Sequence, residues 1–213
     1  MNLKLISIFI FIILFFIIIY INFTHEQFKS DGINIMETNI FNNKELFIIA
    51  NNSNISKKTR QFLDNYDFKN ALIIRFNNGL VKEGVKELCK GKTDIIIYRY
   101  KGNNSYHGFN EQTYLNTKDK LITVFQPHSP DIIKEKINYI LLNKRIFKTG
   151  SAGSTTGFNF IYQIYNKINK IKKIYLIGFT FHDKVNNHYH SELSEHKYFK
   201  KNIEPHKKIK VLL

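Results

Sequence analysis

A short run of small polar residues precedes a segment with helical periodicity. Apolar side chains recur at three- and four-residue intervals over residues 158–168, which predicts an amphipathic helix. The first turn of a helix offers unpaired backbone N–H groups and a dipole that favours anions, so the run is a candidate phosphate-binding loop. An ordinary helix cap is the alternative, because hydroxyl residues are also preferred N-caps. The members of the run are Ser154, Thr155, Thr156 and Gly157.

Histidines cluster near the C-terminal end of the sequence. Imidazole can ligate zinc or copper, but the neighbouring carboxylates follow no known ligand pattern. Histidine is also the usual acid or base near neutral pH, and it is common on solvated surfaces. The residues themselves leave metal ligation, acid/base chemistry and solvated surface open. Five of the eight histidines belong to this cluster: His182, His188, His190, His196 and His206.

Polar side chains follow the first two predicted strands. The apolar run 45–50 ends in Asn51, Asn52 and Ser53, and the run 71–76 is followed by Asn77. Ligands of open α/β sheets bind outside the carboxyl ends of the strands, which places Asn51, Asn52 and Ser53 near a ligand. A capping turn before the next helix is the alternative for the first group.

Arg75 is a charged residue near the end of the second apolar run. A cation in an otherwise buried strand needs a partner or a ligand. Asp67 is a candidate partner within the same part of the sequence.

Apolar runs typical of buried parallel strands alternate with helical segments. Predicted strands cover residues 45–50, 71–76, 94–98, 121–125 and 173–177, and predicted helices cover 56–65, 81–89, 132–142 and 158–168. This alternation predicts an α/β fold with a doubly wound, mostly parallel sheet. The polar segment 99–119 is expected to form a loop over the site or a surface insertion.

The N-terminal part of the sequence predicts a membrane anchor. Residues 5–21 are almost entirely apolar and uncharged, which is near the lower length limit for a transmembrane helix. A cleaved signal peptide is the alternative, but residues 18–27 contain no small-residue cleavage site. The positive-inside rule then gives a short cytoplasmic tail at 1–4, a signal anchor at 5–21, a stem at 22–43 and a lumenal or extracytoplasmic domain at 44–213.

Composition restricts the partners of that domain. The chain has 213 residues, a formal net charge of +15 and a single cysteine, Cys89, so no internal disulfide can form. The positive charge attracts anions such as nucleic acid, acidic lipids and nucleotide sugars. The basic residues are dispersed and form no nucleic-acid-binding motif, so no nucleic acid partner is expected.

Four blocks in this order resemble the motifs of the sialyltransferases, in particular small bacterial or viral relatives of the animal-type enzymes. Residues 49–53 with 74–77 resemble the long motif, and 154–157 with 174–179 resemble the short motif. Residues 188–190 resemble the next motif, and His196 stands where the last motif has its histidine.

Several features depart from the family pattern. Asn51 replaces a glycine, the proline before the block that begins at Ser154 is absent, and Lys201 replaces a glutamate. The interval from His188 to His196 is also shorter than in the animal enzymes, and their disulfide cannot form.

The resemblance implies a Rossmann-like, GT-A-variant sialyltransferase fold behind one transmembrane helix. It implies transfer of sialic acid from the donor CMP-sialic acid to a glycan hydroxyl with inversion. His196 would be the general base and His188 a donor to the leaving phosphate. The residues expected to bind the donor are Asn52, Ser53, Asn77, Ser154, Thr155, Thr156 and Gly157.

The expected partners are a nucleotide-sugar donor, a glycan acceptor and the membrane that holds the anchor. No two aspartates show the Asp-x-Asp spacing of metal-dependent glycosyltransferases, which favours a monophosphate donor with no metal and no further cofactor. A single-pass type II protein of the Golgi is expected in a eukaryotic or virus-infected host. Transfer of a different CMP-activated sugar is one alternative. The other is an inactive, membrane-tethered relative that binds nucleotides or glycans.

Overall fold

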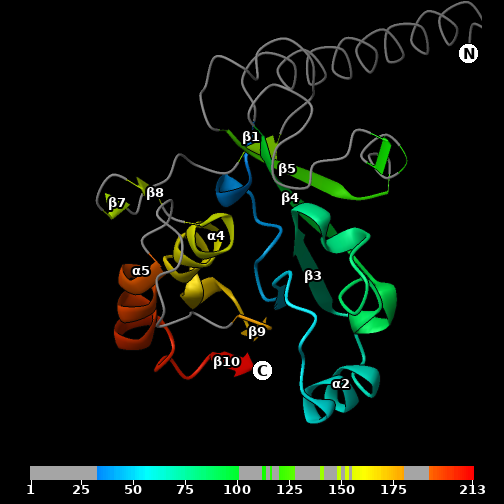
Figure 1. Cartoon of the computed structure of the whole chain (residues 1–213). Helices are drawn as coiled ribbons and strands as arrows, with labels where there is room; N and C mark the ends of the chain where they lie inside the picture. Colours follow the sequence, from blue (N-terminus) through cyan, green and yellow to red (C-terminus); the bar gives the residue numbers. More distant parts are fainter. Residues whose placement is uncertain are drawn as a thin grey trace, which may run out of the picture.

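The computed structural model describes residues 33–100, 112–113, 116, 120–127, 140–141, 148–149, 152–153, 155–179 and 192–213. Eight of its strands form one sheet in the order β1-β6-β5-β4-β3-β2-β9-β10, and every neighbouring pair is parallel (Figure 1). The strands are β1 (Ile33–Asn34), β2 (Glu45–Ile49), β3 (Ala71–Phe76), β4 (Ile95–Tyr100), β5 (Ile122–Pro127), β6 (Ile140–Leu141), β9 (Lys173–Ile177) and β10 (Ile209–Leu212). The α/β fold with a parallel sheet is thus confirmed.

Helices and short turns complete the fold. The α-helices are α2 (Lys57–Asp64), α4 (Thr156–Tyr165) and α5 (Glu192–Tyr198). Shorter helical turns are η1 (Ile35–Glu37), η2 (Asn77–Leu80), η3 (Leu88–Gly91), η5 (Ile168–Lys170) and the π-helical η6 (Phe199–Ile203), and a small antiparallel pair is formed by β7 (Lys148–Thr149) and β8 (Ala152–Gly153).

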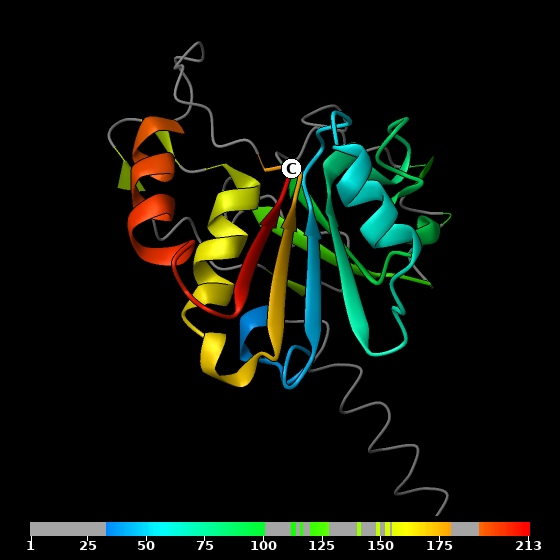
Figure 2. The same cartoon turned by 90° about the horizontal axis from the view of Figure 1, so that it is seen from below.

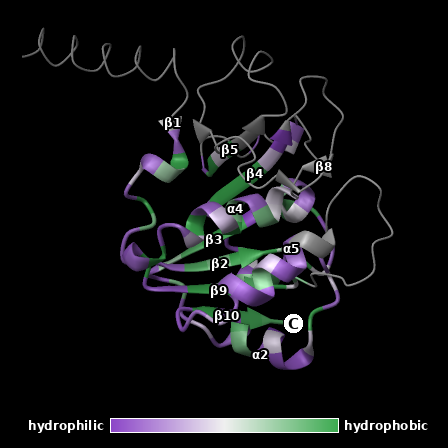
Figure 3. Ribbon diagram, turned by 90° about the vertical axis from the view of Figure 1, so that its left-hand side faces the viewer, coloured by the Kyte–Doolittle hydropathy of each residue, from purple (hydrophilic) through white to green (hydrophobic). Residues whose placement is uncertain are grey.

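Different helices cover the two faces of the sheet (Figure 2). On one face, Phe160 and Ile164 of α4 pack in one cluster with Leu46 and Ile48 of β2. On the other face, Leu63 of α2 belongs to a second cluster. The strands are therefore buried on both sides, which explains their near-continuous apolar sequences. Figure 3 shows these hydrophobic strands between hydrophilic turns.

The order of the strands reverses at β2. From β2 the chain continues to β3, β4 and β5 in one direction across the sheet, whereas β9 pairs with the opposite side of β2. Such a reversal opens a crevice at the carboxyl ends of the strands, which is the usual ligand position in open α/β sheets. Helix α4 precedes β9 in the chain, so its first turn lies at this same end of the sheet.

The folded domain includes residues that the sequence analysis assigned to the stem at 22–43. Ile35, Met36 and Phe41 are buried in the core on the α4 side. The rings of Phe41 and Phe160 meet edge to face with centroids 6.0 Å apart. The domain therefore begins no later than Ile33 rather than at residue 44.

The anchor at 5–21 lies outside the described residues. Within the part of the chain that the structure describes, no helix is both long and apolar enough to cross a membrane.

Two predicted helices need correction. Residues 81–89 form turns and the start of η3, because Gly84 has a φ of 75° and Cys89 and Lys90 also have positive φ. A helix from 132 to 142 is excluded at its end, where Ile140 and Leu141 form β6, and the rest of that segment lies outside the described residues. The sequence analysis did not predict α5 or β10.

Candidate functional site

A pocket of about 260 Å³ lies at the carboxyl ends of the central strands, beside the first turn of α4. Its position matches the crevice expected where the strand order reverses. Four strand ends and one helix end contribute to its wall. The lining residues are Ala50, Asn51, Phe76, Asn77, Arg99, Thr155, Thr156, Gly157 and Phe179.

The first turn of α4 supplies backbone donors to the pocket. Thr155 is the N-cap, and its hydroxyl oxygen accepts the Phe158 N–H at 3.2 Å. The N–H groups of Thr156 and Gly157 donate to no acceptor among the described residues, as expected for the first positions of a helix. A side chain at Gly157 would lie 3.0 Å from the Phe179 ring, so glycine keeps this part of the wall open.

A buried carboxylate borders the same turn. Thr155 donates its backbone N–H to Glu195 Oε1 at 2.6 Å and its hydroxyl to Glu195 Oε2 at 2.9 Å. Glu195 is only 3% exposed, and its negative charge complements the positive end of the α4 dipole. The sequence analysis missed this residue, because Thr155 and Glu195 are 40 positions apart and no local pattern indicates their contact.

Asn77 is held by the end of the neighbouring strand. Its side-chain oxygen accepts the backbone N–H of Arg99 at 3.0 Å, and its backbone has a φ of 47°. Asparagine tolerates this left-handed conformation better than most residues do. The side-chain NH₂ of Asn77 makes no hydrogen bond to any described residue, so it remains a donor for a ligand.

Asn51 places a buried acceptor next to the pocket. Its side-chain oxygen is buried without a hydrogen-bond partner in the described structure. Its backbone carbonyl accepts a hydrogen bond from the ammonium group of Lys82. An unsatisfied buried acceptor costs about 1–3 kcal/mol. A ligand that donates a hydrogen bond to Asn51 would remove that cost.

Asn52 and Ser53 do not line the pocket. The Asn52 side-chain oxygen accepts the Asn54 N–H at 2.9 Å within the turn, and the Ser53 carbonyl accepts a hydrogen bond from Arg60 at 3.0 Å. The structure therefore gives both residues a role in shaping the turn after β2.

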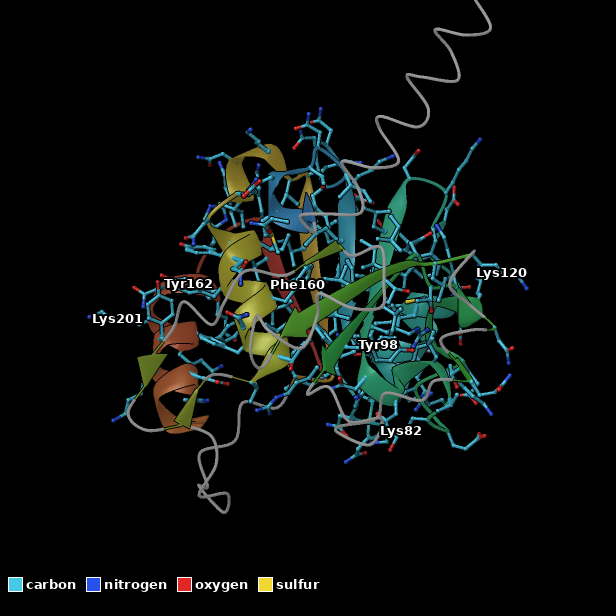
Figure 4. All side chains as sticks on the ribbon, turned by 90° about the horizontal axis from the view of Figure 1, so that it is seen from above. Lys82, Tyr98, Lys120, Phe160, Tyr162 and Lys201 are labelled. Carbon is cyan, nitrogen blue, oxygen red and sulfur yellow. The ribbon has the colours of Figure 1, made fainter. Side chains whose placement is uncertain are left out.

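The remaining predicted residues are only partly placed. His196 is half-buried on α5, directly after Glu195, and is not a lining residue of the pocket. Ser154 and His188 lie outside the described residues. Lys201 is exposed at the periphery of the molecule, away from the sheet (Figure 4).

Arg75 is bound by the protein itself. Its guanidinium group donates to Thr93 Oγ1 at 2.8 Å, to the Val85 carbonyl at 2.6 Å and to the Leu88 carbonyl at 2.7 Å. Arg75 is 1% exposed, and burial lowers the pKa of its guanidinium group. Carbonyl groups, rather than Asp67, are its partners, and their orientation toward Arg75 helps to explain why residues 81–89 are not helical.

Metal binding and thiol chemistry find no support in the described residues. No cluster of three or more potential metal-ligating side chains occurs there, although His188 and His190 lie outside this part. Burial raises the pKa of the Cys89 thiol to about 12, which makes it a poor nucleophile at neutral pH.

The sequence analysis placed Asn51 near a ligand by its position after a strand, although it did not include Asn51 among the donor-binding residues, and Asn51 does line the pocket. The lining residues that the sequence analysis missed are Ala50, Phe76, Arg99 and Phe179. The residues of the pocket come from segments far apart in sequence, from Ala50 to Phe179.

The chain matches no known protein-family model, and no curated protein sequence matches it.

Proposed function

We propose that the protein is a glycosyltransferase of the sialyltransferase type, which transfers sialic acid from CMP-sialic acid to a glycan hydroxyl with inversion. The observation that carries the proposal is the composition of one pocket. Asn77 from the first resembling block and Thr155, Thr156 and Gly157 from the second line it together. These segments are nearly 80 positions apart in sequence, and they share a ligand-sized cavity at the expected end of the sheet.

The donors in the pocket suit a phosphate group. The N–H groups of Thr156 and Gly157 can hydrogen-bond phosphate oxygens at the positive end of α4. Arg99 adds a positive charge to the same wall. Negative charge accumulates on the CMP leaving group as the glycosidic bond breaks. Donors at that position therefore stabilise the transition state more than the ground state.

The amide side chains suit the nucleoside. Asn77 offers its NH₂ group as a donor, and Asn51 offers a buried oxygen as an acceptor. A cytosine ring presents both an exocyclic amine and a carbonyl oxygen, and ribose adds hydroxyl groups. An amide can pair with either kind of partner.

In this proposal His196 is the general base that removes the proton from the acceptor hydroxyl. Glu195 connects the helix that carries His196 to the first turn of α4, beside the pocket. His188 would donate a hydrogen bond to the leaving phosphate. The donor carries a single phosphate, so the reaction needs no metal to neutralise a diphosphate.

The membrane topology and the finer fold belong to the same proposal. The segment 5–21 would anchor the domain, a sialyltransferase-type variant of the α/β fold, on the lumenal or extracytoplasmic side. An inactive relative that binds nucleotides without turnover is the second candidate. It is favoured by Asn51 at the position of a family glycine and by Lys201 at the position of a family glutamate.

Calorimetric titration of the full-length chain in detergent, with CMP and with UDP in the presence of EDTA, tests the proposal. We expect selective binding of CMP and a weakening of about tenfold in Asn77→Ala, since that variant loses one hydrogen bond. Asn78→Ala is the matched control, because Asn78 is exposed and lies outside the pocket. Absence of nucleotide binding by a folded protein would refute the proposal.

Turnover separates the two candidates. Release of CMP from CMP-sialic acid, together with labelling of a glycan acceptor, is expected of the transferase. Nucleotide binding without either product would favour the inactive relative.

A further inference from the structure

The turns at the amino ends of three neighbouring strands carry many lysines. Strands β10, β9 and β2 run in the same direction, and their first residues lie within one position of the same level (Figure 2). The turns that precede them therefore lie together at one end of the sheet. Segments 42–45, 166–173 and 206–209 contain seven lysines and a single acidic residue, Glu45. The lysines are Lys44, Lys167, Lys170, Lys172, Lys173, Lys207 and Lys208.

Hydrogen bonds join these three turns. The Asn43 N–H donates to the Lys170 carbonyl at 2.8 Å. The Lys172 N–H donates in turn to the Lys44 carbonyl at 3.0 Å. The Lys208 ammonium group donates to three carbonyls of the turn before β9, and the shortest of these contacts is 2.7 Å. The seven lysines therefore belong to one continuous part of the surface, which we call the lysine edge.

Much of the positive charge of the lysine edge is not neutralised by described residues. Glu45 accepts the Tyr66 hydroxyl at 2.5 Å and pairs with Lys172 at 3.2 Å. Lys170 and Lys207 are exposed, and their ammonium groups pair with no described carboxylate. Positive charges that are held close together attract anions, so the lysine edge favours an anionic partner.

The arrangement of the lysines suits an extended anionic surface. Neighbouring strands are about 4.8 Å apart, so the lysines of three turns are spread along a row. A lysine ammonium group is a hydrated point charge on a flexible stem, which attracts phosphate headgroups without fixing one of them in a defined geometry. Each lysine close to an anionic lipid surface strengthens the association about fivefold.

The proposed anchor would bring a membrane within reach of the domain. Eleven residues, 22–32, separate segment 5–21 from Ile33, the first described residue. A chain of that length spans at most about 40 Å, so the anchor would hold the domain beside the lipid. Such a tether raises the effective concentration of the lipid surface at the domain.

We propose that the lysine edge binds anionic lipid headgroups of the membrane that holds the anchor. The inference rests on the proposed function, because that proposal supplies the anchor. The pocket lies at the carboxyl ends of the strands, whereas the lysine edge lies at their amino ends. Strands of five residues such as β2 and β9 are about 17 Å long. Binding at the lysine edge therefore turns the pocket away from the lipid and toward glycan acceptors.

Lysine acylation of the full-length chain in lipid nanodiscs tests the inference. One set of discs contains phosphatidylcholine alone, and the other also contains phosphatidylglycerol, which is anionic. Mass spectrometry of peptides measures the rate at which an uncharged reagent acylates each lysine. We expect the rates at Lys44, Lys170 and Lys207 to fall about fivefold in the anionic discs and to recover in high salt. Lys57 and Lys58, exposed in the first turn of α2 at the pocket end of the sheet, should keep their rates.

Paired substitutions identify the charges responsible. Lys170→Gln combined with Lys207→Gln removes two exposed charges from the lysine edge. We expect most of the protection of Lys44 in the anionic discs to be lost, because two lysines together contribute about 25-fold. Lys57→Gln combined with Lys58→Gln is the matched control, since these positions are also exposed, and it should leave the protection of Lys44 unchanged.

The outcomes separate this inference from the proposed function. Equal acylation rates of the lysine edge in both kinds of disc, or protection of Lys44 that persists in the Lys170→Gln/Lys207→Gln variant, overturn the inference alone. Protection by a dissolved acidic polysaccharide, with none from the anionic lipid, also overturns it and indicates a glycan partner. A folded chain that does not co-purify with the discs overturns the anchor of the proposed function, and this inference with it.

Discussion

Arg75 and Arg99 each stand one position before the end of a parallel strand, on β3 and β4 respectively. The Arg75 guanidinium group is enclosed by the Thr93 hydroxyl and by backbone carbonyl groups of residues 85–92. Arg99 lines the pocket. The two positions are not opposite one another in the sheet, because Arg75 pairs with Ile96 and Arg99 lies three residues further along β4. Side chains alternate between the faces of a sheet, so an odd offset turns the two arginines to opposite faces. The place of a strand-end cation in the sheet thus helps to decide whether it holds the fold or meets a ligand.

Replacement of Arg75 by methionine tests the structural half of this comparison. It leaves the carbonyls of Val85 and Leu88 without their donor, and each unsatisfied buried group costs about 1–3 kcal/mol. We expect the free energy of unfolding to fall by about 3 kcal/mol or more, measured by chemical denaturation. A loss below about 1 kcal/mol would contradict the structural role.

His196→Ala tests the proposed reaction at the other side of this comparison, the site at the ends of the strands. A positioned general base contributes about 10²- to 10⁴-fold, so we expect a loss of turnover in that range with CMP affinity nearly unchanged. The variant His206→Ala is the control, because His206 packs edge to face on Tyr165 outside the pocket. Turnover equal to that of the wild type would remove His196 from the mechanism.

Arg99→Gln should give the reverse of the Arg75 result. We expect CMP affinity to fall about tenfold, since hydrogen bonds to charged groups contribute about 1.5–3 kcal/mol. The free energy of unfolding should fall by less than in Arg75→Met, because Arg75 is 1% exposed whereas Arg99 lines the pocket. If instead stability falls as far as in Arg75→Met while affinity is retained, the two arginines do not differ as the structure indicates.

The smallest expected effect concerns Cys89, a buried residue whose thiol lies close enough to Arg75 for the arginine charge to act on it. Burial raises the pKa of this thiol from 9.0 to about 12, although the nearby Arg75 charge opposes the shift. The raised pKa means that its contribution to stability is complete below pH 9 and is lost as the pH rises toward 12. Between pH 9 and 10 the loss is about 1 kcal/mol.

The Cys89→Ala variant should lack that slope. Its baseline stability will be lower, so the comparison concerns the change with pH alone. Tyr98, Tyr66 and Tyr198, whose pKa values burial also raises from 10.0, add a smaller loss in the same window. That loss is common to both proteins, so the difference between their slopes isolates the thiol. An unaltered slope in Cys89→Ala would show that the thiol does not titrate differently in the folded protein.

The elements that could be predicted from sequence are those with unambiguous patterns. The predicted bounds of β3 and β9 agree with the structure, because continuous apolar runs end there in polar turns. Helix α2 is one residue shorter at each end than the predicted helix, since Ser56 and Asn65 are its caps. The predicted helix over 81–89 is wrong, because this segment contains Gly84, which adopts a left-handed conformation.

The candidate site divides along the same line. Thr155–Gly157 follow from the rule about helix starts, which is local in sequence, and Asn77 follows from the family resemblance. Arg99 directly follows the predicted strand 94–98, so the strand-end rule could have indicated it as well. Glu195 could not be placed in this way, because its position depends on a contact between distant segments.

The segment before β2 has a mechanical consequence. Within the described residues, β1 pairs with β6 through two residues at one edge of the sheet, whereas Met36 and Phe41 are buried in the core. A pulling force applied ahead of Ile33 would therefore peel β1 away first and then load the contact between Phe41 and Phe160. In single-molecule stretching from the N-terminal side, we expect a small early extension before the main rupture. The domain would thus yield to tension in two steps, and the pocket would keep its shape through the first.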